Sequence, residues 1–103
     1  MRAAVCAALA LAAACGRGDA PARTHAVAIR GFAYAPDTVV AAPGDTVVWT
    51  NGDVVPHTAT VAGRWDTGEI RGSASGRIVA GEAGTYAYVC AFHPTMRGTL
   101  VVR

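Results

Sequence analysis

From about residue 24 onward, the hydrophobic side chains come in short runs that alternate with polar ones. A period of two places every second side chain on one face of an extended strand, and no window keeps the 3.6-residue period of an amphipathic helix. The pattern therefore predicts seven short strands. They cover residues 25–30, 38–41, 45–50, 58–62, 75–80, 85–90 and 98–103.

The residue types in these runs also favour β-sheet. From residue 16 onward the chain has twelve valines, three isoleucines and ten threonines but a single leucine. Branching at Cβ suits a pleated strand and restricts the side chain in a helix. Turn residues separate the runs, as at Pro43-Gly44, where proline fixes φ and glycine accepts a positive φ. We expect an all-β fold, a Greek-key β-sandwich of about seven to eight short strands.

The run at residues 85–90 indicates which side chains point into this sandwich. Tyr86, Tyr88 and Cys90 occupy alternate positions and therefore share one face of the strand. Cys90 is expected to point inward at the end of the strand, beside aromatic side chains. Tyr86, near the start, is the candidate for a tyrosine corner, in which the hydroxyl group ties a loop to the sandwich.

The N-terminal part of the chain has a different composition. Hydrophobic residues make up 52% of the sequence, and an unbroken apolar run fills residues 3–14 after Met1-Arg2. Such a run is too short to span a bilayer, but with its positive start and small final residues it is typical of a secretory signal. We interpret residues 1–15 as a signal segment, residues 16–24 as a flexible tether and residues 25–103 as one folded domain.

Two ways of processing this segment remain open. Cleavage at the Ala12-Ala13-Ala14 stretch would release the domain, whereas cleavage before Cys15 would leave a cysteine that can carry a lipid. Both predict a periplasmic or extracytoplasmic protein. Contact with a membrane is expected only through a lipid on Cys15.

The charge pattern excludes several function classes. The chain contains no lysine, its formal net charge is only +2, and its arginines form no basic stripe, so no nucleic-acid partner is expected. There is no paired set of carboxylates and no nucleophile with a neighbouring base, so we expect no enzymatic activity. The chain shows no internal repeat, and we expect a monomer.

The candidate chemistry lies near the C-terminus. Cys6 and Cys15 fall in the signal segment, so Cys90 is the one thiol of the expected domain and has no internal disulfide partner. His93 and Met96 follow it at intervals of three residues, which lets one loop curl around a single ion. The second imidazole is assigned to His57, because the alternative, His25, adjoins the tether.

Each of these residues also has a purely structural interpretation. A cysteine at a strand end or a methionine beside proline is often core, and a loop histidine is usually solvated. Together, however, two imidazoles, one thiolate and one thioether exclude hard cations such as Mg²⁺ and Ca²⁺ and exceed what structural zinc requires. The set is typical of a blue-copper electron-transfer site. The large aromatic side chains, Trp49, Trp65, Phe32 and Tyr34, are expected to pack in the core.

The segments around these candidate ligands resemble those of a known family. The segments PGDTVVWTN at 43–51, VPHT at 55–58 and AGTYAYVCAFHPTMRG at 83–98 are similar to those of cupredoxins, the type 1 blue-copper proteins, of the amicyanin and plastocyanin type. The resemblance implies one type 1 copper ion, with His57, Cys90 and His93 as strong ligands and Met96 as the weak axial ligand. It also implies an electron carrier between larger redox proteins outside the cytoplasm.

The resemblance leads to two expectations about the surroundings of the site. Asn51 is expected to tie the His57 segment to the Cys90 segment, although Thr58 stands where the family often has asparagine. Redox partners are expected to dock near His93, where Phe92 and Pro94 would form part of a small apolar surface. The alternative function is a periplasmic protein for copper storage or delivery, which the low methionine content disfavours. A sandwich without metal, used for adhesion, would leave Cys90 and the ligand spacing unexplained.

Overall fold

The structure, a computed structural model, describes residues 20–103. The predicted signal segment, residues 1–15, and the first part of the predicted tether lie outside the described residues. The described part contains strands and turns, with no helix that could cross a membrane. Its strands are β1 (Thr24–Ile29), β2 (Tyr34–Ala35), β3 (Thr38–Ala41), β4 (Thr46–Asn51), β5 (Thr60–Val61), β6 (Trp65–Asp66), β7 (Ser75–Val79), β8 (Gly84–Val89) and β9 (Arg97–Val102).

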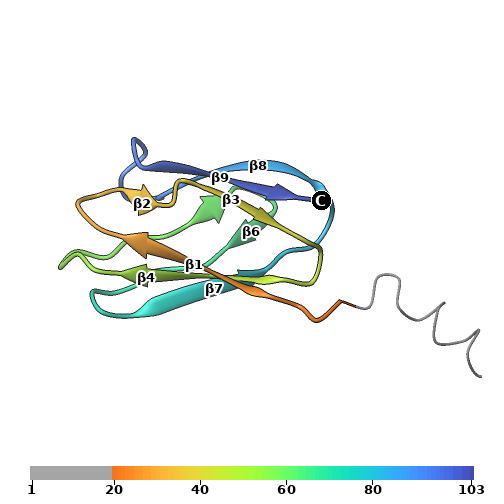
Figure 1. Ribbon diagram of the computed structural model, residues 1–103. Coiled ribbons are helices and arrows are strands. Elements are labelled where there is room, and N and C mark those ends of the chain that lie inside the picture. The colour runs from red at the N-terminus through yellow and green to blue at the C-terminus, as the bar shows by residue number, and fades with distance from the viewer. Residues whose placement is uncertain (1–19) are drawn as a thin grey trace, which may run out of the picture.

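These strands form two sheets that pack face to face (Figure 1). One sheet has the strand order β2-β1-β4-β7, and the other has the order β3-β9-β8-β5-β6. The chain crosses between the sheets, so that β1 lies parallel to β4 and β3 lies parallel to β9, whereas the remaining pairs are antiparallel. The all-β sandwich expected from the sequence is confirmed.

The predicted strands agree with the observed ones except around the run at 58–62. There the strand is reduced to the two residues of β5, of which only Thr60 pairs with β8, because the preceding backbone groups bond elsewhere. The N–H of Thr58 points to the sulfur of Cys90, its carbonyl accepts the hydroxyl of Tyr34, and the N–H of Ala59 donates to Thr67. The short strands β2 and β6 were not predicted, because two residues are too few to show a period.

Aromatic side chains fill the space between the sheets. Trp49, on β4, and Tyr88, on β8, are fully buried, and the indole N–H of Trp49 donates to the Tyr88 hydroxyl at 3.2 Å. The Tyr88 ring lies directly over Gly98 of β9, where an added Cβ atom would stand 2.3 Å from the ring. Glycine is therefore required at position 98 for close packing of this ring.

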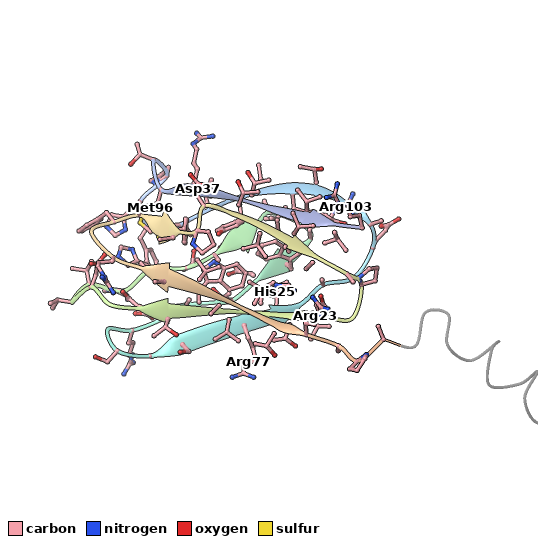
Figure 2. All side chains as sticks on the ribbon, in the orientation of Figure 1. Arg23, His25, Asp37, Arg77, Met96 and Arg103 are labelled. Atoms are coloured by element: carbon pink, nitrogen blue, oxygen red, sulfur yellow. The ribbon has the colours of Figure 1, made fainter. Side chains whose placement is uncertain are left out.

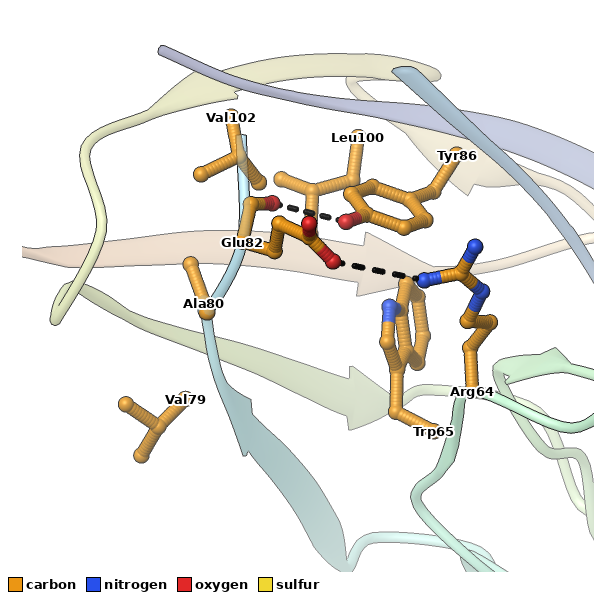
Figure 3. A pocket seen from close by; sticks show the side chains of 9 residues that line it. Arg64, Trp65, Val79, Ala80, Glu82, Tyr86, Leu100 and Val102 are labelled. Carbon is orange, nitrogen blue, oxygen red and sulfur yellow. Dashed lines mark hydrogen bonds and ion pairs between the residues drawn. The ribbon is translucent and has the colours of Figure 1, made fainter. Parts of the chain in front are cut away.

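The tyrosine corner is also confirmed, at the opposite end of β8 from Cys90. The hydroxyl of Tyr86 donates to the carbonyl of Glu82 at 2.7 Å, which ties the turn before β8 to the sheet (Figure 3). Arg64 stacks over the Tyr86 ring and forms a 3.6 Å ion pair with the Glu82 carboxylate. Both charged side chains of this ion pair are exposed, so its contribution to stability is small.

Candidate metal centre

Three predicted site residues meet at one end of the sandwich. His57 follows the loop after β4, Cys90 directly follows β8, and His93 lies in the loop between β8 and β9. One donor atom from each lies within 4.8 Å of the others. The Cys90 sulfur is 3.7 Å from Nδ1 of His57 and 3.6 Å from Nδ1 of His93. His57 and Cys90 are buried, whereas His93 is partly exposed.

The backbone of the 90–96 loop explains how its side chains gather. The N–H of His93 donates to the carbonyl of Cys90, and the N–H of Met96 donates to the carbonyl of His93. The N–H of Cys90 then closes the loop on the carbonyl of Met96 at 3.2 Å. Each interval of two residues thus forms one turn, as the spacing predicted. Met96 is buried at the same end of the sandwich (Figure 2).

His57 is held in one orientation by its backbone and its ring. Its N–H and C=O groups pair with those of Ile70, and the imidazole is fully buried. Nε2 lies 2.9 Å from the carboxylate of Asp53, which leaves Nδ1 facing the sulfur of Cys90. The N–H of Phe32, more than any other group, holds the pKa of the Asp53 carboxyl below its usual range. The ring nitrogen of His57 therefore faces an ionised acceptor.

The expected role of Asn51 is not the one observed. Its side-chain amide donates to the carbonyls of Val55 and Ile70, so it shapes the loop that carries His57 but makes no such contact with the Cys90 segment. Thr58 makes that connection instead. Its Oγ1 accepts the N–H of Ala91 at 2.8 Å, and its own N–H points to the Cys90 sulfur at 3.4 Å. A threonine hydroxyl thus joins the two segments.

Phe32 is likewise not a core residue, contrary to the sequence expectation. Its side chain is 50% exposed, and its backbone has a left-handed φ of 59°. The ring stands edge-on to the imidazoles of His57 and His93, with centroids at 5.1 and 4.8 Å. The other three aromatic residues of that expectation are buried or partly buried.

The donor atoms present fit one metal ion of the blue-copper type. The Nδ1 atoms of His57 and His93 both face the Cys90 sulfur, and a buried thioether is available in the same loop. Two imidazoles with a thiolate form the trigonal set to which copper electron-transfer sites add a weak, long axial methionine contact. Oxygen donors, which Mg²⁺ and Ca²⁺ require, are not part of this group.

Comparison with known proteins agrees with this geometry. The family profile described as a cupredoxin-like domain matches residues 2–102. The chain belongs to the cupredoxin family. This cupredoxin is 37% identical over 90 residues to an amicyanin of Paracoccus versutus, covering 82% of this chain and 68% of the relative. It is 40% identical over 65 residues to an amicyanin of Paracoccus denitrificans, covering 57% of this chain and 50% of the relative.

Solved structures of amicyanin variants have the same fold as this cupredoxin. The Cu(I) form of a methionine-to-alanine variant aligns with a TM-score of 0.72 at 31% identity, covering 82% of this chain and 87% of that structure. The reduced Cu(I) form at pH 4 of a proline-to-glycine variant aligns with a TM-score of 0.71 at 31% identity. That alignment covers 78% of this chain and 82% of that structure.

Proposed function

We propose that this cupredoxin is an exported electron-transfer protein that binds one type 1 copper ion and passes single electrons between redox partner proteins. The observation that carries the proposal is the convergence of two imidazole nitrogens on one buried thiol, His57 and His93 on Cys90. Similarity to amicyanins supports it. The protein acts as a carrier and not as an enzyme.

In this proposal His57, Cys90 and His93 are the strong ligands and Met96 is the weak axial ligand. The copper ion supplies a Cu(I)/Cu(II) couple when it is bound. Sulfur donors suit Cu(I) and imidazoles suit Cu(II), so the mixed set is acceptable to both states. The turns of the 90–96 loop and the Thr58 bond to Ala91 hold the donors in place, so little rearrangement accompanies gain or loss of an electron.

Partner proteins would dock on the surface around His93. Its ring is the partly exposed imidazole of the pair, and Phe92 beside it is 51% exposed. Pro94 follows, and Val54 and Val55 on the neighbouring loop are also exposed. A small apolar surface of this kind suits weak, short-lived encounters that bury little area. Electrons would enter and leave through His93.

The periplasmic location in this proposal rests on residues 1–15, which lie outside the described residues. Their short apolar run and small final residues support export. A mass spectrum of the mature protein tests the processing. A mass that begins at Cys15 with added acyl chains indicates a lipid anchor, whereas an unmodified N-terminus nearby indicates release. A full-length mass from an exporting host would contradict export.

The functional proposal is tested by adding one equivalent of Cu(II) to the purified mature protein. We expect an intense visible thiolate-to-copper charge-transfer band that Cys90→Ser abolishes and His25→Ala leaves intact, because His25 bonds to Asp45 instead. Repeated reduction and reoxidation without loss of copper is the result expected of an electron carrier. Loss of the ion in each cycle would favour the alternative, copper storage or delivery, and a colourless protein would overturn the blue-copper assignment.

A further inference from the structure

One carboxylate beside the metal centre binds three donors from two separate segments. Oδ1 of Asp53 accepts the N–H of Gly31 at 2.8 Å. Oδ2 accepts the N–H of Phe32 at 2.9 Å and lies 2.9 Å from Nε2 of His57. The Asp53 side chain is 14% exposed and the imidazole is fully buried. The carboxylate therefore connects the turn between β1 and β2 to the loop that carries His57.

The first consequence concerns the tautomer of His57. An ionised carboxylate can only accept hydrogen bonds, so the nitrogen facing it must carry the proton. With Nε2 protonated, Nδ1 keeps its lone pair and directs it toward the Cys90 sulfur. A carboxylate behind a ligand histidine fixes the ring orientation in this way and raises the basicity of the ligand nitrogen.

The second consequence concerns the aromatic ring over the two imidazoles. Gly31 and Phe32 both have positive φ, at 60° and 59°, and a phenylalanine in this region is strained unless other contacts hold it. Their successive N–H groups converge on the Asp53 carboxylate, as in the backbone nests that bind anions. The turn held in this way places the Phe32 ring edge-on to both histidines and covers part of the ligand set.

We propose that Asp53 is a positioning residue of the metal centre. Its carboxylate fixes the metal-binding tautomer of the buried His57 and, through the Gly31-Phe32 turn, seats the Phe32 ring against both imidazoles. The inference rests on the proposed function, because it concerns the same site. The spacing of the ligands along the chain indicates neither the Asp53 carboxylate nor the Phe32 ring as part of the site.

The chain supplies a matched control at the opposite end of the sandwich from Met96, near Arg23 and His25 (Figure 2). There Asp45 also accepts two backbone N–H groups, from Arg23 and Ala42, and lies 2.9 Å from Nε2 of His25. The two carboxylates thus have the same three kinds of partner, but only Asp53 faces a histidine of the donor group. Substituting Asp45 removes a purely structural hydrogen-bond network, whereas substituting Asp53 also removes a carboxylate that faces the metal centre. Comparing the two variants therefore distinguishes these two effects.

The experiment compares Asp53→Ala, Asp53→Asn and Asp45→Ala in the mature protein. We expect Asp53→Ala to lower the affinity for Zn(II), measured by chelator competition, by roughly 10–100-fold. Both Asp53 variants should raise the reduction potential of the copper form, because a negative charge that favours Cu(II) is removed. Asp45→Ala should lower the melting temperature but leave Zn(II) affinity within about twofold and the potential unchanged. Equal losses of affinity in Asp53→Ala and Asp45→Ala, or an unchanged potential in Asp53→Asn, would overturn the proposal.

A measurement on the unsubstituted protein keeps the test decisive if Asp53→Ala does not fold. Nitrogen-15 NMR of the protein without metal, recorded at a pH where the imidazole ring is neutral, should show His57 protonated at Nε2 and not at Nδ1. The opposite tautomer would contradict the role of Asp53. Because Zn(II) affinity and the tautomer do not depend on copper, a protein that binds Zn(II) through these residues but develops no blue colour would refute the proposed function and still test this inference.

Discussion

The threonine that joins the two ligand segments gives the sharpest prediction for stability. Thr58→Val keeps the shape of the side chain but removes Oγ1, which accepts the N–H of Ala91 at 2.8 Å and bonds to the hydroxyl of Thr60 at 2.9 Å. A typical hydrogen bond contributes about 1 kcal/mol net, so the loss should be about 2 kcal/mol. For a domain of this size each kcal/mol lowers the melting temperature by about 4–8 °C, which predicts a fall of about 8–16 °C.

The assay is thermal unfolding of the protein without metal, followed by circular dichroism, together with hydrogen exchange at the Ala91 amide. Thr60→Val is the matched control, because it removes a hydroxyl that bonds to Thr58 and to the exposed Asp66 but leaves the Ala91 bond in place. Because the bond to Asp66 is exposed, we expect Thr60→Val to lower the melting temperature by less than Thr58→Val does. The Ala91 amide should keep its normal protection from exchange in Thr60→Val. A Thr58→Val protein that melts within about 2 °C of the unsubstituted protein, with Ala91 still protected, would refute the reasoning.

Three further predictions concern packing, pH and metal. Gly98→Ala should cost about 3 kcal/mol or more in the free energy of unfolding, measured in urea, because the added methyl group meets the buried Tyr88 ring; an unchanged midpoint would contradict this packing. The N–H of Arg23, followed by His25 and Ala42, lowers the pKa of Asp45 from its ordinary 3.8 to about 2. The ionised Asp45 carboxylate therefore contributes to the free energy of unfolding above about pH 4, and this contribution is lost as the pH falls toward 2. Urea titrations should find this pH dependence weakened in Asp45→Asn. Removal of copper should lower the melting temperature, because an ion at 100 times its dissociation constant stabilises the folded state by about 2.7 kcal/mol, and equal melting temperatures would count against a folded-state site.

Local patterns were enough to predict most of the fold. Branched side chains in alternating runs predicted the longer strands, because strand period and β-propensity are properties of a few neighbouring residues. The turns of the 90–96 loop were predictable for the same reason, since their hydrogen bonds span only short intervals. The Tyr86 corner likewise joins residues four positions apart.

Contacts between distant segments could not be predicted in this way. The bond from Ala91 to Thr58 joins residues 33 positions apart, and the bond from Phe32 to Asp53 joins residues 21 apart. Neither has a signal in the spacing of the chain, because each depends on how the sheets pack. For the same reason the sequence predicted the wrong role for Asn51 and placed Phe32 in the core. The position of Phe32 directly after Gly31 was the available signal for an exposed turn.

The central claim is that one copper ion binds at the point where His57, Cys90 and His93 converge. The most direct test is anomalous diffraction at the copper edge from crystals of the copper-loaded protein. We predict a single peak close to the Cys90 sulfur and both Nδ1 atoms, with the Met96 sulfur as a more distant fourth neighbour. A peak at His25 and Asp45, or no peak near Cys90, would contradict the account.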